Sequence, residues 1–261
     1  LQLEGVKKVY LHLFTDGRDS GQHDAHKHFT KLKERLHGNE KLATIMGRYY
    51  GMDRNKMWER TEAAYDALVL GQGKKASDFE EAITMAYNSG ETDEFISPTV
   101  MQEGGAPVAI IKDNDVIFFF NLRSDRARQL TKAFVQPDFG KDNPGAFHRK
   151  FKPKNIRFVA MTDFGPDLPS IFTSFPSRDV HNSLVQVLCP RSQMYIAESE
   201  KFAHVTYFLN GGYAQHFCNE QWVKVESDHV KDFDGRPAMK AGEIIEHLIN
   251  AVRAGSYEFI A

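Results

Sequence analysis

The chain has 261 residues, of which 41% are hydrophobic and 26% are charged, so it is long enough to bury one sizeable core, or two smaller ones, without disulfides or metal ions. Its 33 Lys and Arg residues against 35 Asp and Glu residues give a formal net charge of -2, which argues against nucleic-acid or membrane-surface binding through bulk charge. No apolar run approaches the ~20 residues of a membrane span and no signal-peptide pattern opens the chain, so we expect a cytoplasmic globular protein in which any basic site is local.

Short apolar runs alternate with amphipathic stretches of helical length, which is the pattern of an α/β domain. In chain order the pattern predicts a strand at 8–14, a helix at 23–36, a strand at 41–47, helices at 55–69 and 77–90, strands at 107–112 and 116–121, a helix at 124–135, strands at 155–162 and 193–198, and a helix at 239–255. Ser77 is the expected N-cap of helix 77–90, with Glu80 as its capping-box partner. Residues 112–115, KDND, indicate a hairpin turn and hence at least one antiparallel pair. The expected fold class is α/β, with a mixed, mainly parallel sheet flanked by helices.

Four polar clusters each lie just beyond a predicted strand. TDGRDS (15–20), GRYYGMDR (47–54), NLRSDR (121–126) and TDFGPD (162–167) follow strands 8–14, 41–47, 116–121 and 155–162. In open α/β sheets, ligands gather outside the carboxyl ends of the strands, where loops and helix N-termini meet. The placement of these clusters therefore predicts a binding site at the strand ends.

Arginine recurs in three of these clusters, at Arg18, Arg48, Arg54, Arg123 and Arg126. A guanidinium is permanently charged and binds carboxylate or phosphate oxygens in a bidentate way, so several together suit a small, highly anionic ligand. Arg123 and Arg126 are expected to share one helical face, with Asp125 elsewhere. Arg128 is expected on the solvent side. For any single cluster the alternative is a surface ion pair of about 0 to 1 kcal/mol, but the repetition at strand ends favours a site.

A fifth polar cluster lies in AESEKFAHVTYFLNGG (197–212). Lys201, near the start of a predicted helix, is a candidate phosphate ligand, and the alternative is an exposed charge in the first helical turn. His204 follows at the spacing of Arg126 from Arg123. A histidine in such a segment is more often a core or capping residue than a base.

Three patterns that suggest other chemistry are incomplete. GQGKK (71–75) lacks the GxxxxGK[ST] spacing of a phosphate-binding loop and follows a helix, so we expect a linker. His23 and His26 share a helical face, but no third ligand stands at zinc-site spacing. Cys189 and Cys218 show no CxxC spacing, so we expect both to be reduced thiols of a cytosolic protein. Serine-hydrolase and zinc-protease motifs do not occur.

Read in order, the motifs resemble those of the cofactor-independent (2,3-bisphosphoglycerate-independent) phosphoglycerate mutases. The resemblance rests on HLFTDGRDS, GRYYGMDRNKMWERTEAAYDALV, DEFISPTV, IFFFNLRSDRARQL, AESEKFAHVTYFLNGG and RPAMKAGEI, which run along nearly the whole chain. DGRD and GRYY-x-MDR are the most specific of these motifs. The family more often has Phe and Pro where this chain has Leu122 and Ser124, a change that leaves both arginines of NLRSDR in place.

The resemblance implies an isomerase of glycolysis and gluconeogenesis, which interconverts 3-phosphoglycerate and 2-phosphoglycerate through a phosphoserine. In such enzymes an alkaline-phosphatase-like domain holds two divalent metal ions, taken to be Mn²⁺, and the serine, while an inserted domain holds the glycerate. We expect residues 1–235 to be that inserted domain and residues 236–261 to be a return segment toward the other domain. No metal is expected on this chain. A monomer that binds a small-molecule substrate, but neither nucleic acid nor membrane, is expected.

By the same resemblance, six residues match substrate-binding positions, namely Arg18, Asp19, Arg48, Arg54, Arg123 and Arg126. Lys201 matches the lysine that reaches toward the transferred phosphate. No segment matches the serine nucleophile, the histidine-bearing motif that normally precedes DGRD, or the Asp and His metal motifs. Both ends, at Leu1 and at the closing YEFIA, look cut. Because arginines orient a glycerate but supply neither phosphoserine nor metal ions, we expect the chain alone to be inactive or nearly so.

Two other functions are compatible with parts of the pattern. A non-catalytic module that grips anions or nucleic-acid phosphates would use the same arginines, but it would show interleaved exposed aromatics and steeply salt-dependent binding. A self-contained phosphatase would need Asp16 or Asp163 as its nucleophile. Neither aspartate lies in a DxDx[TV]-like context.

Overall fold

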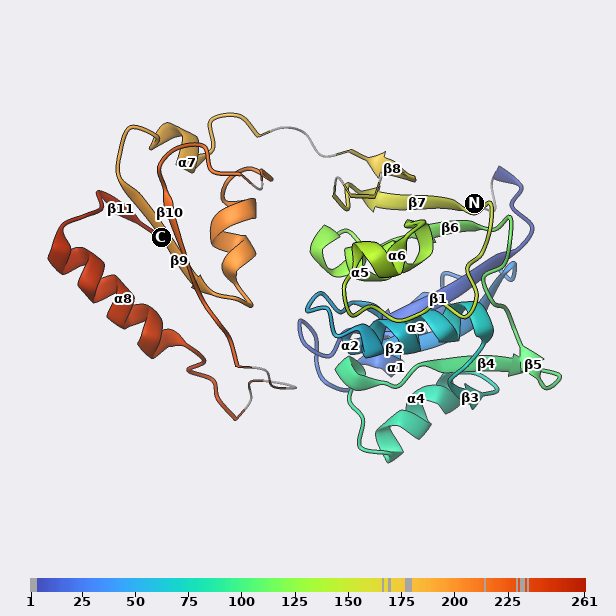
Figure 1. Ribbon diagram of the computed structural model, residues 1–261. Coiled ribbons are helices and arrows are strands. Elements are labelled where there is room, and N and C mark those ends of the chain that lie inside the picture. Colours follow the sequence, from blue (N-terminus) through green and yellow to red (C-terminus); the bar gives the residue numbers. More distant parts are fainter. Residues whose placement is uncertain are drawn as a thin grey trace. The chain divides into compact units, whose positions relative to one another are not determined.

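A computed structural model gives the fold of residues 4–165, 167–168, 170–176, 180–213, 215–228, 230, 233 and 235–261. Contacts between residues divide the chain into two units, Leu1–Ser177 and Arg178–Ala261 (Figure 1). Over these residues, the first unit holds a five-stranded and a three-stranded sheet, and the second unit holds another three-stranded sheet.

The five-stranded sheet of the first unit runs in the order β1-β2-β4-β3, with β5 paired to β4. Its strands are β1 (Val9–Thr15), β2 (Glu40–Gly47), β3 (Lys74–Ala76), β4 (Thr99–Glu103) and β5 (Ala106–Pro107). β1 pairs with β2 in parallel and β3 with β4 in parallel, whereas β4 runs antiparallel to both β2 and β5. The sheet is therefore mixed, as predicted, although its antiparallel pairs involve β4 and not residues 112–115.

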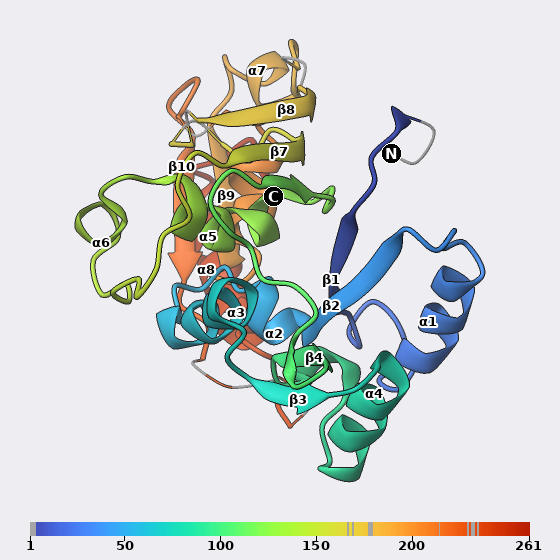
Figure 2. The same ribbon diagram turned by 90° about the vertical axis from the view of Figure 1, so that its right-hand side faces the viewer.

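Helices cover both faces of this sheet, as Figure 2 shows. Ile45 and Met46 are neighbours on β2, so their side chains point to opposite faces. Ile45 packs in a cluster with residues of α1 (Ala25–Lys33) and α4 (Phe79–Asn88), and Met46 packs in another with residues of α3 (Trp58–Leu70). Burial on both faces explains why β2 reads as a nearly continuous apolar run and not as an alternating one.

The three-stranded sheet of the first unit has the order β6-β7-β8, with parallel pairs throughout. Its strands are β6 (Val116–Phe119), β7 (Arg157–Thr162) and β8 (Ile171–Phe175). Helix α5 (Ser124–Val135) follows β6, and the short helices of the unit are α2 (Arg48–Gly51), η2 (Asp93–Phe95) and α6 (Phe139–Asp142). Phe119 and Phe158 join the cluster that contains Met46 and the buried residues of α3 and α5. One core thus connects the two sheets.

The second unit is built on the parallel sheet β10-β9-β11. Its elements are α7 (Leu184–Val187), β9 (Gln193–Glu198), the π-helix η3 (His204–Phe208), β10 (Gln221–Val225), α8 (Ala241–Ala254) and β11 (Phe259–Ile260). Ile244 and Ala251 of α8 pack on Met194, Ile196 and Val225. Segment 236–261 is therefore packed within this unit, while the expected boundary of an inserted domain at residue 235 stays a prediction. None of the helices in the described ranges is long and apolar enough to cross a membrane.

The cysteine prediction is wrong. Cys189 and Cys218 form a disulfide, with Cα atoms 5.5 Å apart. Cys189 follows α7 and Cys218 precedes β10, so the bond closes a loop that contains β9 and η3. The two residues are 29 apart in sequence and are brought together by tertiary structure, for which their spacing carries no signal.

Two local predictions also need correction. The strand expected at 107–112 is replaced by an irregular segment, in which the Ile111 amide donates to the Leu68 carbonyl at 2.8 Å, so no hairpin forms at 112–115. The N-cap of α4 is Asp78 and not Ser77, because the Asp78 carboxylate accepts from the Glu81 amide. Ser77 instead donates its hydroxyl to the Glu81 carboxylate at 2.6 Å.

Candidate anion-binding site

Three strands of the first unit deliver the segments that follow them to one place. β1 leads into residues 16–20, β2 leads into α2 and the loop 52–57, and β6 leads into α5. The rings of Phe14, near the end of β1, and Phe119, at the end of β6, have centroids 5.9 Å apart. The ends of these strands are therefore adjacent although the strands belong to different sheets.

Arg48 is the buried arginine of this site, with 4% of its surface exposed. It begins α2 directly after β2, and its Nη1 donates to the carboxylates of Asp16 and Asp19, the latter at 2.9 Å. The hydrogen bond from Arg48 lowers the pKa of Asp19, and the charges of Arg123 and Arg18 act in the same direction. Asp19 is therefore an ionised acceptor at neutral pH.

Asp125 lies inside the arginine cluster, which corrects the expectation that it points elsewhere. Its Oδ2 accepts from Arg54 at 2.5 Å and from Arg123 at 3.3 Å. Burial by itself raises the pKa of Asp125, but the hydrogen bond from Arg54 and the charges of Arg123 and Arg54 outweigh it, so the pKa is lower than usual. One carboxylate thus joins an arginine of loop 52–57 to an arginine at the start of α5.

Arg126 is the arginine of the cluster whose charged form is most disfavoured by its surroundings. Its Nη1 donates to the Met52 carbonyl at 3.3 Å. Burial, followed by the positive charges of Arg54, Arg48 and Arg18, lowers the pKa of Arg126 to about 10. At neutral pH the side chain remains charged in a place where its charge is poorly compensated.

Arg18 and Glu94 complete the cluster, because Arg18 Nη1 lies 3.4 Å from Glu94 Oε1. The segment around Glu94 fits tightly against the ends of β1 and β2. A Cβ at Gly17, which has φ +67°, would lie 2.5 Å from the Glu94 amide nitrogen, and one at Gly47 would lie 2.1 Å from the Glu94 carbonyl oxygen. Only glycine fits at these two positions. The sequence prediction missed Glu94, because η2 precedes a strand whereas the predicted site residues all follow strands or begin helices.

The five arginines therefore lie together, and among the residues that the structure describes they contact the carboxylates of Asp16, Asp19, Glu94 and Asp125. Within the part of the chain that the structure describes, the Nε atoms of Arg48 and Arg126 are buried without a hydrogen-bond partner. A small anion that carries several oxygens would supply negative charge and acceptors to such a cluster. The arrangement is suited to holding such an anion, and it offers positioning and charge neutralisation but no nucleophile of its own.

Two further predicted residues have other surroundings. Arg128 pairs with Asp167 and is about one-third exposed, so it is only partly the solvent-side charge that was expected. Lys201 belongs to the second unit, where it is exposed and its amide donates to the Glu198 carbonyl at 2.9 Å. His204 begins η3 and is exposed as well, so it is not a core histidine.

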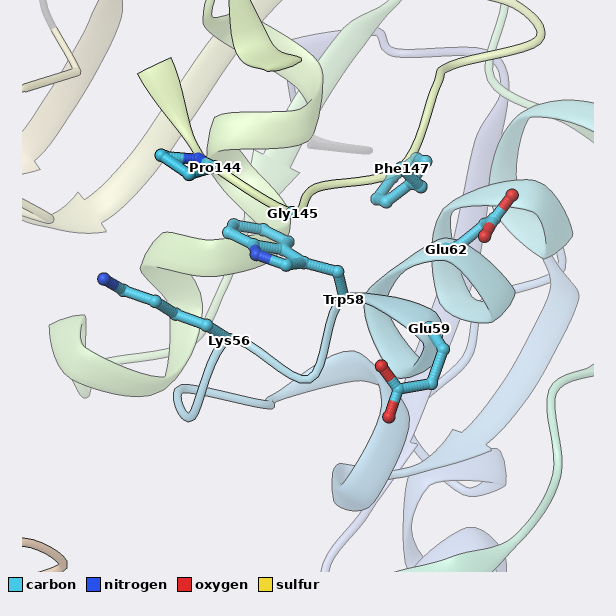
Figure 3. A pocket seen from close by; sticks show the side chains of 7 residues that line it. All are labelled: Lys56, Trp58, Glu59, Glu62, Pro144, Gly145 and Phe147. Atoms are coloured by element: carbon cyan, nitrogen blue, oxygen red, sulfur yellow. The ribbon is translucent and has the colours of Figure 1, made fainter. Parts of the chain in front are cut away.

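A pocket of about 460 Å³ lies elsewhere in the first unit (Figure 3). It is lined by Lys56, Trp58, Glu59, Glu62, Pro144, Gly145 and Phe147. Its walls include two carboxylates and none of the five arginines, so it is not the anion-binding candidate. Among the residues that the structure describes, no three His, Cys, Asp or Glu side chains gather in a way that would hold a metal ion.

Comparison with known proteins identifies similar sequences over the whole chain. The family model described as "BPG-independent PGAM N-terminus" matches residues 1–166. The 2,3-bisphosphoglycerate-independent phosphoglycerate mutase 1 of Methanosarcina barkeri is 46% identical over 267 residues, which cover 99% of this chain and 50% of that protein. The 2,3-bisphosphoglycerate-independent phosphoglycerate mutase of Clostridium perfringens strain ATCC 13124 is 41% identical over 98% of this chain and 50% of its own length.

A solved structure also matches. A crystal structure of Leishmania mexicana phosphoglycerate mutase, determined at low cobalt concentration, superposes with a TM-score of 0.81 at 27% sequence identity. The match covers 99% of this chain and 49% of that one. The chain spans about half the length of the curated relatives it matches.

Proposed function

Because the chain belongs to the 2,3-bisphosphoglycerate-independent phosphoglycerate mutase family, we propose that it forms the substrate-binding part of an enzyme that interconverts 3-phosphoglycerate and 2-phosphoglycerate. The observation that carries the proposal is the gathering of five guanidinium groups from three strand ends around a few carboxylates. The residues proposed to bind substrate are Arg18, Asp19, Arg48, Arg54, Arg123, Arg126 and, from the second unit, Lys201.

The charge distribution supports a division of roles among these residues. Phosphoglycerate carries a carboxylate and a phosphate, and both match the planar fork of a guanidinium. Arg126, whose charge is the least compensated, gains most from a bound anion. Asp19 is exposed and ionised, so it is suited to accept a hydrogen bond from a glycerate hydroxyl and not to donate a proton.

The remaining parts of the proposal concern groups outside this cluster. Metal dependence is a property of the family, and we propose two divalent ions, Mn²⁺, for the complete enzyme. The described side chains of this chain do not fit a metal site. We further propose residues 1–235 as an inserted domain and 236–261 as a return segment. We also propose that the complete enzyme is a monomer, that it acts in glycolysis in the cytoplasm, and that it has no nucleic-acid or membrane partner.

Calorimetric titration of the 261-residue chain with 3-phosphoglycerate tests the binding role. Loss of a hydrogen bond to a charged group costs roughly 1.5 to 3 kcal/mol, so Arg54→Ala and Arg123→Ala should each weaken binding by about tenfold or more. Arg35→Ala is the matched control, because Arg35 is an exposed arginine of the same unit that follows α1. Equal affinity of all four proteins would remove the proposal. Tighter binding of a single-stranded oligonucleotide than of 3-phosphoglycerate would favour the nucleic-acid alternative.

A coupled assay tests the catalytic part separately. We propose that the chain alone binds phosphoglycerate without converting it, because an arginine cluster supplies no phosphoryl acceptor. Formation of 2-phosphoglycerate by the purified chain in the presence of Mn²⁺ would overturn this part and leave the binding role in place.

A further inference from the structure

The first half of α5 contacts the loop 52–57 through residues 125, 126 and 129. Asp125, Arg126 and Gln129 are spaced at helical intervals, so they lie on the same side of α5. Asp125 accepts from Arg54, and Arg126 donates to the carbonyl of Met52. The third residue of this face, Gln129, is uncharged.

Both the oxygen and the nitrogen of the Gln129 carboxamide form hydrogen bonds in this contact. Its Oε1 accepts from the Lys56 amide at 2.9 Å, and its Nε2 donates to Asp53 Oδ2 and to Thr61 Oγ1, each at 2.7 Å. The side chain is 5% exposed. Lys56 has φ +59°, a backbone conformation that is costly for a residue with a side chain. A fixed acceptor for its amide stabilises the loop in this conformation.

Asp53 organises the loop from within. It is 5% exposed, and its carboxylate accepts from the amides of Asn55 at 3.2 Å and Met57 at 3.0 Å and from Arg60 at 3.2 Å. Burial raises the pKa of Asp53, while the hydrogen bond from Gln129 and the charge of Arg60 oppose that effect. The loop that carries Arg54 is thus folded around Asp53, and Gln129 joins this folded loop to α5.

We propose that Gln129 is a positioning residue of the anion site, which fixes the separation between Arg54 on the loop and Arg123 and Arg126 on α5. The proposal rests on the proposed function, because it concerns the geometry with which these arginines hold phosphoglycerate. A guanidinium binds an oxyanion well only when its fork faces the oxygens. Displacement of a positioning group by about 1 Å costs as much as ~100-fold in enzymes, so a loosened loop is expected to weaken the ligand contact.

Gln136 provides a matched control on the same helix. It is the C-cap residue of α5 and is 7% exposed. Its Nε2 donates to the Asp167 carbonyl at 3.3 Å, and its Oε1 accepts from Asn143 at 2.6 Å. Gln129→Met and Gln136→Met therefore remove the same buried hydrogen-bonding group, and only the first removes contacts with loop 52–57.

Titration calorimetry with 3-phosphoglycerate on the 261-residue chain is the test, with the unfolding midpoint measured for every variant. Gln129→Met should weaken binding by about tenfold, and Gln136→Met by less than about twofold, although both lower the midpoint. If Gln129→Met does not fold, Gln129→Asn gives the same test, because a carboxamide shortened by one methylene group cannot reach Lys56, Asp53 and Thr61 together and introduces no buried charge.

The outcomes separate this inference from the proposed function. If the unmodified chain binds no 3-phosphoglycerate, the proposed function fails and the inference fails with it. If the unmodified chain binds and Arg54→Ala weakens binding, but the Gln129 variants bind as tightly as the unmodified chain or no more weakly than Gln136→Met, only the inference is overturned.

Discussion

Arg54 and Asp125, which are 71 residues apart in the sequence, are joined by a hydrogen bond of 2.5 Å between Nη1 and Oδ2. Arg123 donates to the same oxygen, so one carboxylate holds two guanidinium groups from different elements. The side chains of Arg54 and Asp125 are each only about 15% exposed, which limits screening of their interaction by water and salt. Asp125 is therefore a counter-ion that Arg54 and Arg123 share.

Asp125→Asn is expected to change how stability depends on pH. The net effect of the surroundings is to lower the pKa of Asp125, so its folded pKa lies below the unfolded value of about 3.9. A carboxyl group of this kind contributes stability that is complete at neutral pH and is lost as the pH falls through about 4 and below. Urea unfolding between pH 3 and pH 7 should show the largest gap between the unmodified chain and Asp125→Asn at neutral pH. A gap of constant size would contradict the prediction.

Arg126→Met is expected to stabilise the chain while weakening anion binding. Burial and the charges of neighbouring arginines, chiefly Arg54, lower the pKa of Arg126 to about 10. Removal of this charge relieves an unfavourable interaction, and loss of the hydrogen bond to Met52 offsets part of the gain. We expect the free energy of unfolding to rise by about 1 kcal/mol and the affinity for 3-phosphoglycerate to fall at least tenfold, by about 1.4 kcal/mol or more.

Arg128→Met is the control for that experiment. Arg128 lies on the same helix but pairs with Asp167, outside the cluster. Arg128→Met should show neither the rise in the free energy of unfolding nor the loss of affinity for 3-phosphoglycerate. A fall in both quantities for Arg126→Met would mean that Arg126 is mainly a structural residue.

Tyr65→Phe is expected to lower stability without changing anion affinity. The Tyr65 side chain is fully buried, and its hydroxyl donates to the Phe151 carbonyl at 2.9 Å. Burial raises the pKa of Tyr65, so the hydroxyl stays protonated as a donor in the usual working range of pH. Loss of one buried hydrogen bond should cost about 1 kcal/mol in urea unfolding. An unchanged free energy of unfolding would show that this bond makes no net contribution.

Reduction of the Cys189–Cys218 disulfide is expected to destabilise the second unit alone. The residues are 29 apart, and closure of a loop of that length stabilises a fold by about 3.6 kcal/mol in the chain-entropy description. Hydrogen exchange measured by mass spectrometry should therefore accelerate in β9 and β10 after addition of a reductant, and not in β1 or β2. The variant with both cysteines changed to serine should exchange rapidly with or without the reductant. Equal acceleration in both units would contradict the prediction.

The longer elements were predictable from the sequence, and the shorter ones were not. The helix 124–135 and the strand 193–198 have the predicted bounds, because each carries a strong periodic or continuous apolar signal. The apolar run 107–112 gave the same signal, but Ile111 is buried from an irregular segment that bonds to the end of α3. Burial explains an apolar run without specifying its backbone, which is why this strand was predicted wrongly.

The candidate site was predictable as a set of positions but not as a set of contacts. Strand-end placement brings the five arginines together in the structure, and their role as substrate ligands stays a proposal. Helical spacing placed Asp125 away from the arginine face, because it gives no information on the loop 52–57 that packs against the start of α5, and the pairing of Asp125 with Arg54 was therefore missed. The buried link from Gln129 to Asp53 has no sequence signal either, because a single glutamine in a helix is ordinary.

The reversed direction of β4 also determines where the protein tolerates alteration. β4 starts next to η2, at the arginine cluster, and ends at the opposite end of the neighbouring strand β2. There Glu103 Oε2 lies 2.7 Å from Lys41 Nζ, near the start of β2. An inserted residue just before Thr99 would displace Glu94. The turn at Gly104 and Gly105, by contrast, has open space around both residues and lies a strand length from the site. A fluorophore or an affinity tag attached at this turn would therefore report on the protein without touching the ligand.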